Sequence, residues 1–479
     1  MQLMVHIPKK WQTPLFLLGV SAALFLLWLP NMRYPLVSDS MQYAHLSRNF
    51  WTTGSYQLDG VLHPYHMPLF PIASYWSIAL FGMNDGLKIA SLLYGMVMYA
   101  LIFFFVRSLR PSERLTPFLT VSFLLLSFPT VWLLSLGNAD TFFGILFFAT
   151  LIIYGKAEKN PRWYLLSGLL IGLASLCRYP GLTLLPIIGL HALLTRHSHL
   201  RSPSFWIQFA IAIAFFSLWP LRNFLLFDTL ATGHFANEFQ REGTWVSYLV
   251  RNLLYYFNPV YSIMLMALPA AWGLIRFGKR HLLAMLAIPG SMFFAFLYHA
   301  VTVRFMVVTI PLLLFFAALG VADMWRRLPH FVTILFLTAA LPVQAGFVCF
   351  YSLPQCHAFV DRLDIPGLPK DFGWTQEGFE SFQEAVDWVK RHTPESAEIA
   401  GTSIGELDLP VWEDFTKRHP AIAARVVFSC ERPAFAIFSQ SEDPRLRDPD
   451  FITTNHPQFF VYALTKDECT TFNKMQEKF

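Results

Sequence analysis

Residues 64–82, PYHMPLFPIASYWSIALFG, decide how this chain is threaded through a membrane. They are apolar enough to be a membrane span, although Pro64, Pro68 and Pro71 interrupt the first part of the stretch. If they crossed the membrane, the basic loop at 107–114 and every later loop would change sides. Lys and Arg would then lie outside, against the rule that concentrates them in cytoplasmic loops. We therefore predict an interfacial or re-entrant helix on the outer face.

The composition is that of a membrane protein. Of the 479 residues, 55% are hydrophobic and only 14% are charged, and the mean hydropathy is +0.44. An ordinary soluble domain has about 25% charged residues, so we predict an α-helical protein with many spans. The net charge of +5 does not indicate nucleic-acid binding, because most basic residues fall in short loops between apolar runs.

About eleven apolar runs are predicted to cross the membrane, because each is close to the length that a span needs. The runs at 163–177 and 180–195 are short, so we expect broken or tilted helices around Arg178, Tyr179 and Pro180. The first run is predicted to be a retained helix and not a cleaved signal peptide. The runs are 12–30, 86–106, 115–135, 140–155, 163–177, 180–195, 204–221, 257–275, 281–299, 305–324 and 330–350.

Basic residues occupy alternate connections between these runs, which predicts a cytoplasmic N-terminus in a multi-pass inner (plasma) membrane protein. The outer side then receives residues 31–85, the Asn138–Asp140 turn, the loop 222–256, Arg304 and everything after Tyr351. The basic residues are Lys9, Lys10, Arg107, Arg110, Arg114, Lys156, Lys159, Arg162, Arg196, Arg201, Arg276, Lys279, Arg280, Arg326 and Arg327.

The tail, residues 351–479, has the composition of a small soluble α/β domain on the extracytoplasmic side. Residues 379–394 have helical spacing of apolar residues, and 397–401, 424–428 and 458–464 are typical of strands. Residues 466–479 are predicted to form a closing helix. Cys349, Cys356, Cys430 and Cys469 lie at or beyond the outer surface, where an oxidising compartment allows a disulfide, but the spacing does not select a pairing.

The long loop at 31–85 is the candidate functional segment, because long ordered loops are usually functional. Tyr43, Leu46 and Phe50 lie at helical spacing, so residues 40–51 are predicted to form an amphipathic helix on the membrane surface. Asp39 stands at its start. It is either the helix cap, supported by Gln42, or a general base that deprotonates an acceptor hydroxyl at the mouth of a cavity between helices.

A second candidate group follows where the loop returns to the membrane. GVLHPYHMPLFP brings His63, Tyr65 and His66 toward the bilayer. A histidine there is able to hold a phosphate or a divalent metal ion. The alternative is that these residues only anchor the segment at the interface.

Several ordered motifs resemble the polyprenyl-phosphate-dependent glycosyltransferases of the GT-C membrane fold, which include protein O-mannosyltransferases and aminoarabinose transferases. The motifs lie in the order that this superfamily has and extend over most of residues 12–350. They are SDSMQYAHLSRNFWTTGSY at 38–56, HPYHMPLFPIASYWSIALFG at 63–82, GLLIGLASLCRYPGLTLLPIIGL at 168–190, LWPLRNFLLFDTLATG at 218–233 and VRFMVVTIPLLLFFAALGV at 303–321.

The resemblance implies a GT-C-like domain over 1–350, with 31–85 as its first outer catalytic loop. It implies inverting transfer of a sugar from a polyprenyl-phosphate donor to a lipid, glycan or protein acceptor outside the membrane. Asp39 matches the acidic residue taken as the base, and Asp140, in GNAD, matches a second carboxylate.

The resemblance also suggests which residues hold the donor. Arg178, Arg222 and Arg304 would neutralise the departing donor phosphate, helped by His63 and His66. The alternative for the arginines is snorkelling at the interface or pairing with Asp140 or Asp228. Tyr43 and Tyr65 are predicted to line the substrate site.

The chain departs from the pattern at two places. Ser40 stands where a second acidic residue often follows the first, which puts a paired-carboxylate metal site in doubt. Tyr65 and His66 stand where some members have a Lys. No cofactor is predicted, and a divalent metal is left open.

A many-span lipid or glycan transporter is the competing interpretation. It predicts repeated halves and ionisable residues near the middle of the membrane. The chain shows no such repeat, and its notable charges are predicted at one face.

Overall fold

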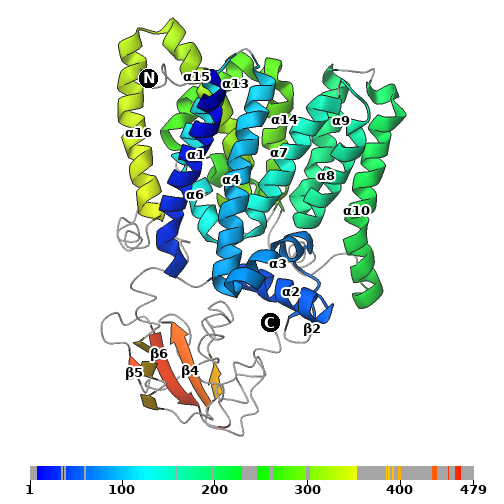
Figure 1. Ribbon diagram of the computed structural model, residues 1–479, viewed down its shortest axis with the longest axis vertical. Coiled ribbons are helices and arrows are strands. Elements are labelled where there is room, and N and C mark those ends of the chain that lie inside the picture. Colours follow the sequence, from blue (N-terminus) through cyan, green and yellow to red (C-terminus); the bar gives the residue numbers. More distant parts are fainter. Residues whose placement is uncertain are drawn as a thin grey trace.

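The computed structural model places two groups of elements, a large helical bundle and a short sheet (Figure 1). Every structural statement below concerns the residues that the structure describes. These are 8–33, 36, 39–58, 61–111, 113–157, 159–195, 199–228, 245–257, 263–297, 303–352, 384–385, 387–388, 391–392, 398–400, 434–439, 451–452, 459–464 and 466.

The bundle consists of apolar helices that run back and forth between two ends (Figure 1). Helix α8 packs against both α7 and α10, and α4 packs against α3, α5 and α7. The bundle helices are α1 (Lys9–Trp28), α4 (Met83–Leu109), α5 (Leu115–Leu125), α6 (Phe128–Ser135), α7 (Ala139–Ala157), α8 (Trp163–Cys177), α9 (Leu184–Thr195), α10 (Pro203–Phe227), α13 (Ala267–Phe277), α14 (Leu282–Leu297), α15 (Thr309–Arg327) and α16 (His330–Ser352).

The predicted membrane fold is confirmed, and each of the eleven apolar runs is largely helical. By length and composition, seven helices of the described chain qualify as spans, or eight if the pair α5 and α6 is one span bent by 61°. The predicted runs 257–275 and 281–299 form a single 34-residue candidate, Met264–Leu297. Helix α8 and the segment Tyr179–Thr195 are shorter than a full span.

The predicted break near Arg178 is confirmed. Helix α8 ends at Cys177, and Arg178 is extended, with φ −153° and ψ 141°. A 3₁₀ turn, η3 (Tyr179–Thr183), then leads into α9. Pro180 lies in the first turn of η3, where its missing N–H is not needed. The break aims the Arg178 side chain at the end of the bundle.

A layer of short elements lies across one end of the bundle (Figure 1). It comprises α2 (Asp39–Thr53), the hairpin β1 (Gln57–Leu58) and β2 (Val61–Leu62), and α3 (Leu69–Phe81). Helix α2 packs on α3, and α3 packs on the first turns of α4. Gly82 has φ +82°, a value that favours glycine, and it turns the chain from α3 into α4. At about 1.5 Å per residue, the 13 residues of α3 are too short to span about 30 Å of hydrocarbon.

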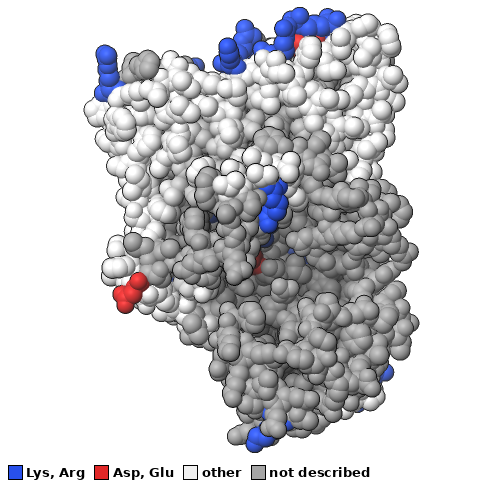
Figure 2. Space-filling view, turned by 180° about the vertical axis from the view of Figure 1, so that it is seen from behind, with Lys and Arg blue, Asp and Glu red and all other residues white. Residues whose placement is uncertain are grey.

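Basic side chains gather at the opposite end of the bundle (Figure 2). Arg107 lies in the last turn of α4, Lys156 in the last turn of α7, and Arg326 and Arg327 in the last turn of α15. The loops that carry basic residues, which alternate along the sequence, therefore lie together at one end of the bundle.

One helix was not predicted. Helix α12 (Trp245–Phe257) covers the end of the segment 222–256, which was predicted to be an outer loop. The amide nitrogen of Asn252 donates to the carbonyls of Ala295 and Phe296 at 3.0 Å each, which fastens α12 to the end of α14.

Four described strands of the tail form a mixed sheet in the order β3-β4-β6-β5. They are β3 (Glu398–Ala400), β4 (Ala434–Ser439), β5 (Phe451–Ile452) and β6 (Phe459–Leu464). Strands β3 and β4 are parallel, and the other pairs are antiparallel. Two of the predicted strands correspond to β3 and β6, whereas β4 and β5 were missed. The predicted strand 424–428, nearly all of the helix 466–479, and the side chains of the four outer cysteines lie outside the described residues.

Close packing of α13 on α15 depends on Gly320. A Cβ atom at Gly320 would overlap the carbonyl oxygen of Pro269 on α13. Gly320→Ala is therefore expected to lower the stability of the bundle by about 1–3 kcal/mol, because the two backbones have to separate. Thermal unfolding of the detergent-solubilised protein measures the change. Gly155→Ala in α7 is the matched control, since a Cβ there meets nothing within 4 Å. An equal loss in both variants would contradict the packing argument.

Candidate active site

Asp39 lies at the first turn of α2, at the end of the bundle that carries α2 and α3. Its Oδ2 accepts a hydrogen bond from Nη2 of Arg304 at 2.7 Å. Its Oδ1 lies 3.7 Å from Nε2 of His66. The side chain keeps 31% of its surface exposed. Asp39 therefore meets a cation and an imidazole while part of its surface stays accessible to a substrate.

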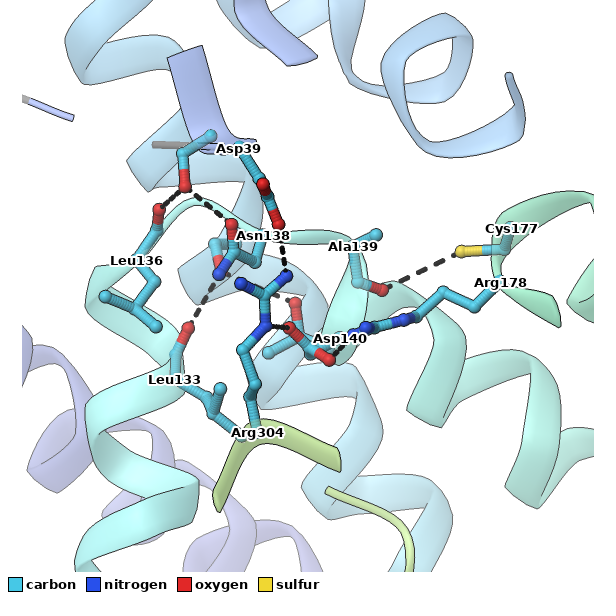
Figure 3. Close-up of polar contacts among 12 residues, drawn as sticks. Asp39, Leu133, Leu136, Asn138, Ala139, Asp140, Cys177, Arg178 and Arg304 are labelled. Carbon is cyan, nitrogen blue, oxygen red and sulfur yellow. Dashed lines mark hydrogen bonds and ion pairs between the residues drawn. The ribbon is translucent and has the colours of Figure 1, made fainter. Parts of the chain in front are cut away.

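Arg304 joins two carboxylates that come from distant parts of the chain (Figure 3). It lies in the 3₁₀ turn η8 (Val303–Met306), just before α15. Besides its bond to Asp39, its Nε lies 3.4 Å from Oδ2 of Asp140. Two of the three arginines predicted to bind phosphate thus lie close together, because Arg178 reaches the same Asp140.

Asp140 is fully buried in the first turn of α7. Arg178 Nη1 forms an ion pair with its Oδ1, from the side opposite Arg304 (Figure 3). Burying a carboxylate without partners would be costly, and the two guanidinium groups supply the compensating charge. The alternative that the sequence left open, pairing of the arginines with Asp140, therefore describes Arg178 and Arg304.

Two residues that sequence reasoning did not select hold the turn before Asp140. The Oγ of Ser40 lies 2.6 Å from Oδ1 of Asn138 and also contacts the carbonyl oxygen of Leu136. Ser40 therefore ties the start of α2 to the turn that precedes α7 (Figure 3). The sequence could have indicated both residues by their positions alone, since Ser40 directly follows Asp39 and Asn138 precedes Asp140 by two residues.

His63 and His66 are both buried and form a stacked pair. Their ring centroids are 4.9 Å apart, and Nε2 of His63 lies 2.7 Å from Nδ1 of His66. The hydroxyl of Tyr56 donates to the backbone carbonyl of His66 at 3.0 Å. Sequence reasoning did not select Tyr56, which fixes the turn that carries His66.

Arg222 lies apart from the two carboxylates. Its Nη1 donates to the carbonyl of His63 at 3.1 Å and to Oδ1 of Asn223 at 2.8 Å. Its guanidinium lies over the rings of Tyr56 and Trp219, at 5.8 and 4.6 Å from their centroids. These contacts tie α10 to the loop that carries the histidine pair.

The two tyrosines predicted to line the substrate site differ in exposure. Tyr43 is buried, and its ring meets the ring of His66 edge-on at 4.8 Å. Burial, helped by the charge of Asp39, raises the pKa of Tyr43, so its hydroxyl stays protonated. Tyr65 is 44% exposed and contacts the ring of His63.

The electrostatics of the site keep Asp39 ionised. Burial by itself raises the pKa of the Asp39 carboxyl, but the charge of Arg304 and the interaction with His66 outweigh it, so the pKa lies well below the ordinary value of 3.8. In the cluster of Asp39, Asp140, Arg178 and Arg304, the Asp39 carboxylate is therefore the more exposed group, and the two guanidinium groups are less exposed. Among the described residues, no group of three or more His, Cys, Asp or Glu side chains is arranged to hold a metal ion.

Comparison with known proteins supports the resemblance that the sequence motifs showed. Residues 63–220 match the family model described as dolichyl-phosphate-mannose-protein mannosyltransferase. This segment contains His63, His66, Asp140 and Arg178, and it ends just before Arg222. A search of curated proteins gives no match.

Solved structures match the fold over almost the whole chain. Apo ArnT from Cupriavidus metallidurans matches with a TM-score of 0.57 at 15% identity, covering 95% of this chain and 98% of that one. ArnT bound to undecaprenyl phosphate matches with a TM-score of 0.55, with the same identity and coverage. The oligosaccharyltransferase AglB from Archaeoglobus fulgidus, in complex with an inhibitory peptide and a dolichol-phosphate, matches with a TM-score of 0.50 at 11% identity, covering 90% of this chain and 70% of that one. The family match over residues 63–220 and the shared fold make this chain similar to membrane glycosyltransferases of the GT-C fold.

Proposed function

We propose that this protein transfers a sugar from a polyprenyl-phosphate carrier to an acceptor hydroxyl at the outer end of the bundle, with Asp39 as the general base. The observation that carries the proposal is the bridge formed by Arg304. It holds a partly exposed carboxylate, Asp39, next to a buried pair, Asp140 and Arg178. A base and cations at one site suit a reaction in which one group loses a proton and another leaves as an anion.

The arginines would act on the leaving phosphate. A guanidinium carries five N–H donors, more than one carboxylate can accept, so Arg178 and Arg304 are able to bind phosphate oxygens while they contact Asp140. Glycosyl transfer passes through an oxocarbenium-like state, in which negative charge grows on the leaving phosphate. Asp140 would then position the two arginines.

The geometry favours inversion at the anomeric carbon. Retention by double displacement requires a carboxylate free to attack the sugar. Asp140 is fully buried between Arg178 and Arg304, which makes it a poor nucleophile. With Asp39 as the base on the attacking hydroxyl and not as a nucleophile, transfer would be a single displacement, which inverts the anomeric carbon.

The side of the membrane that the site faces is inferred from the distribution of basic residues. The basic end shown in Figure 2 is opposite the end with α2, α3 and the site. By the positive-inside rule, the N-terminus is cytoplasmic in the inner (plasma) membrane and the site faces outward. Residues 1–350 would then form the transferase domain, with 31–85 as its outer catalytic loop. Residues 351–479 would form an extracytoplasmic domain over the outer end.

The donor and the acceptor come from two different phases. The proposed donor is a sugar linked to a polyprenyl phosphate, which reaches the site from the bilayer, among membrane lipids. ArnT and AglB have been solved with undecaprenyl phosphate and dolichol-phosphate, respectively, which supports this donor class. The acceptor is a lipid, glycan or protein that presents a hydroxyl at the outer face.

Transfer is tested with purified protein and the polyprenyl-phosphate-sugar fraction of a bacterial envelope-lipid extract. Release of free polyprenyl phosphate, measured by mass spectrometry, is the expected result. Absence of release with every extract and acceptor mixture tried would count against the proposal.

Arg178→Gln is expected to weaken the binding of undecaprenyl phosphate about 10- to 100-fold. The variant removes a charge-assisted contact worth about 1.5–3 kcal/mol, and 1.4 kcal/mol corresponds to a tenfold change in affinity. Binding is measured by thermophoresis of the labelled protein in detergent. Arg276→Gln is the matched control, because Arg276 lies near Asp323 at the basic end. Equal affinity for both variants would remove Arg178 from the phosphate site.

A further inference from the structure

The two oxygens of the Asp39 carboxylate face different partners. Oδ2 accepts from Arg304 at 2.7 Å, and Oδ1 faces Nε2 of His66 at 3.7 Å. On its other side, His66 meets His63 through a 2.7 Å contact between Nδ1 and Nε2. Asp39, His66 and His63 therefore lie in a row, with a hydrogen-bonding distance between the two histidines and a 3.7 Å gap between His66 and Asp39.

Asp39 alone is poorly suited to keep a proton. Its pKa lies well below 3.8, because Arg304 and His66 outweigh the effect of burial, so the protonated carboxylic acid is a high-energy species at neutral pH. A base of this kind works best when a neighbour removes the proton as it arrives. Imidazole is the side chain that titrates near neutral pH, which suits it to this task.

The charges of Asp39, Asp140, Arg178 and Arg304 also favour a neighbouring group that takes up the proton. Asp39 and Asp140 carry two negative charges, and Arg178 and Arg304 carry two positive charges, so the four side chains sum to zero. When the sugar leaves, the phosphate changes from a diester to a monoester and gains negative charge. A proton held on the histidines, beside Asp39, would offset that gain.

We propose that His66 and His63 form a proton relay that takes the acceptor's proton from Asp39; this inference rests on the proposed function. It replaces the role in phosphate binding that the sequence suggested for the two histidines. His66 is then a positioning and proton-accepting partner of the base, and His63 is the second acceptor.

The proposed step conserves atoms and charge. The acceptor oxygen forms a bond to the anomeric carbon, and the bond from that carbon to the phosphate oxygen breaks, with its electron pair leaving on the phosphate. The hydroxyl proton passes to Asp39 and then to Nε2 of His66. The proton that His66 held on Nδ1 passes to Nε2 of His63, and water removes it as the products leave.

The surroundings of the pair come from three elements. From α2, Asp39 and Tyr43 face His66. From α10, Arg222 binds the carbonyl of His63, and from η8, Arg304 holds Asp39. Tyr56 and Tyr65, both titratable, also contact the pair or its backbone.

The test compares His66→Gln with wild type in the release of polyprenyl phosphate from the envelope-lipid fraction. Gln keeps a polar side chain near Asp39 but cannot accept the proton. We expect kcat to fall about 100-fold, the acid limb of the kcat profile between about pH 5 and 8 to disappear, and the donor KM to change little. The solvent deuterium isotope effect on kcat is expected to shrink as well.

Two further variants show whether the loss of activity in His66→Gln comes from the lost proton transfer or only from disturbed packing. His63→Gln is expected to lower kcat but to keep the acid limb, because His66 is still present to accept the proton from Asp39. His191→Gln is the matched control, since His191 is a buried histidine that contacts Tyr154 Oη at 3.0 Å within the bundle. It is expected to keep both kcat and the limb.

The possible results distinguish a failure of the relay from a failure of the proposed transferase function. If Asp39→Asn is inactive while His66→Gln keeps its kcat and its acid limb, the relay is wrong and the base stands. If His66→Gln instead raises the donor KM at unchanged kcat, the histidine binds phosphate and the relay is again wrong. If Asp39→Asn remains active, the proposed function itself fails.

Discussion

Asp39→Asn is expected to reduce sugar transfer by about 10²- to 10⁴-fold, the range associated with loss of a general base. Asn keeps the size of the side chain and accepts a hydrogen bond from Arg304, but it cannot take a proton. The measurement is release of polyprenyl phosphate by purified protein from the envelope-lipid fraction.

Two controls make the result specific to the base. Asp39→Asn is expected to bind undecaprenyl phosphate within a few-fold of wild type, because Arg178 and Arg304 remain. Asp323→Asn removes another carboxylate that contacts two arginines, Arg276 and Arg327, but at the basic end of the bundle. It is expected to keep full transfer activity. If Asp39→Asn transferred sugar like wild type, Asp39 would be the helix cap that its position also allows, and the base would have to be sought elsewhere.

Asp140→Asn is expected to have the largest effect on stability. It leaves Arg178 and Arg304 pointing at a neutral, fully buried amide. Breaking a buried ion pair by removing one partner costs about 3–5 kcal/mol, because the remaining charge stays buried. The midpoint of thermal unfolding in detergent is expected to fall accordingly, and transfer activity is expected to fall with it.

Added anion distinguishes the cause of this loss. Phosphate should partly restore the unfolding midpoint of Asp140→Asn, because an anion can replace the missing carboxylate between the two arginines. Asp323→Asn is the comparison here as well, since Asp323 is 8% exposed and its arginines reach solvent more easily. The electrostatic account would be wrong if the two variants lost the same stability and neither responded to phosphate.

Most of the bundle was predictable from the sequence because its signals are local. Apolar runs and alternating basic loops fix which segments are helical and which ends they share. Prolines and short lengths predicted the break at Arg178, and the positive-inside argument kept residues 64–82 out of the set of spans. Helix α12 was missed because it lies in a loop whose fold depends on contact between Asn252 and the end of α14.

The site was predictable as a set of residues but not as a geometry. Asp39, Asp140, Arg178 and Arg304 all stood at predicted outer ends, yet no pattern in the sequence shows that Arg304 contacts both carboxylates. Arg222 had the same kind of signal and lies elsewhere, on the carbonyl of His63. Which arginine meets which carboxylate depends on how the helices pack, and a single sequence does not encode that locally.

The span of the Arg304 bridge has a consequence for biogenesis. Arg304 and Asp39 are 265 residues apart, so the ribosome synthesises more than half of the 479-residue chain between them. Asp39 and Asp140 are therefore synthesised long before the arginine that they share. A nascent chain that ends before η8 has both carboxylates but lacks the residue that joins them. The cluster of Asp39, Asp140 and Arg304 is therefore completed late in synthesis, when the turn before α15 has been made, and shorter nascent chains do not contain it.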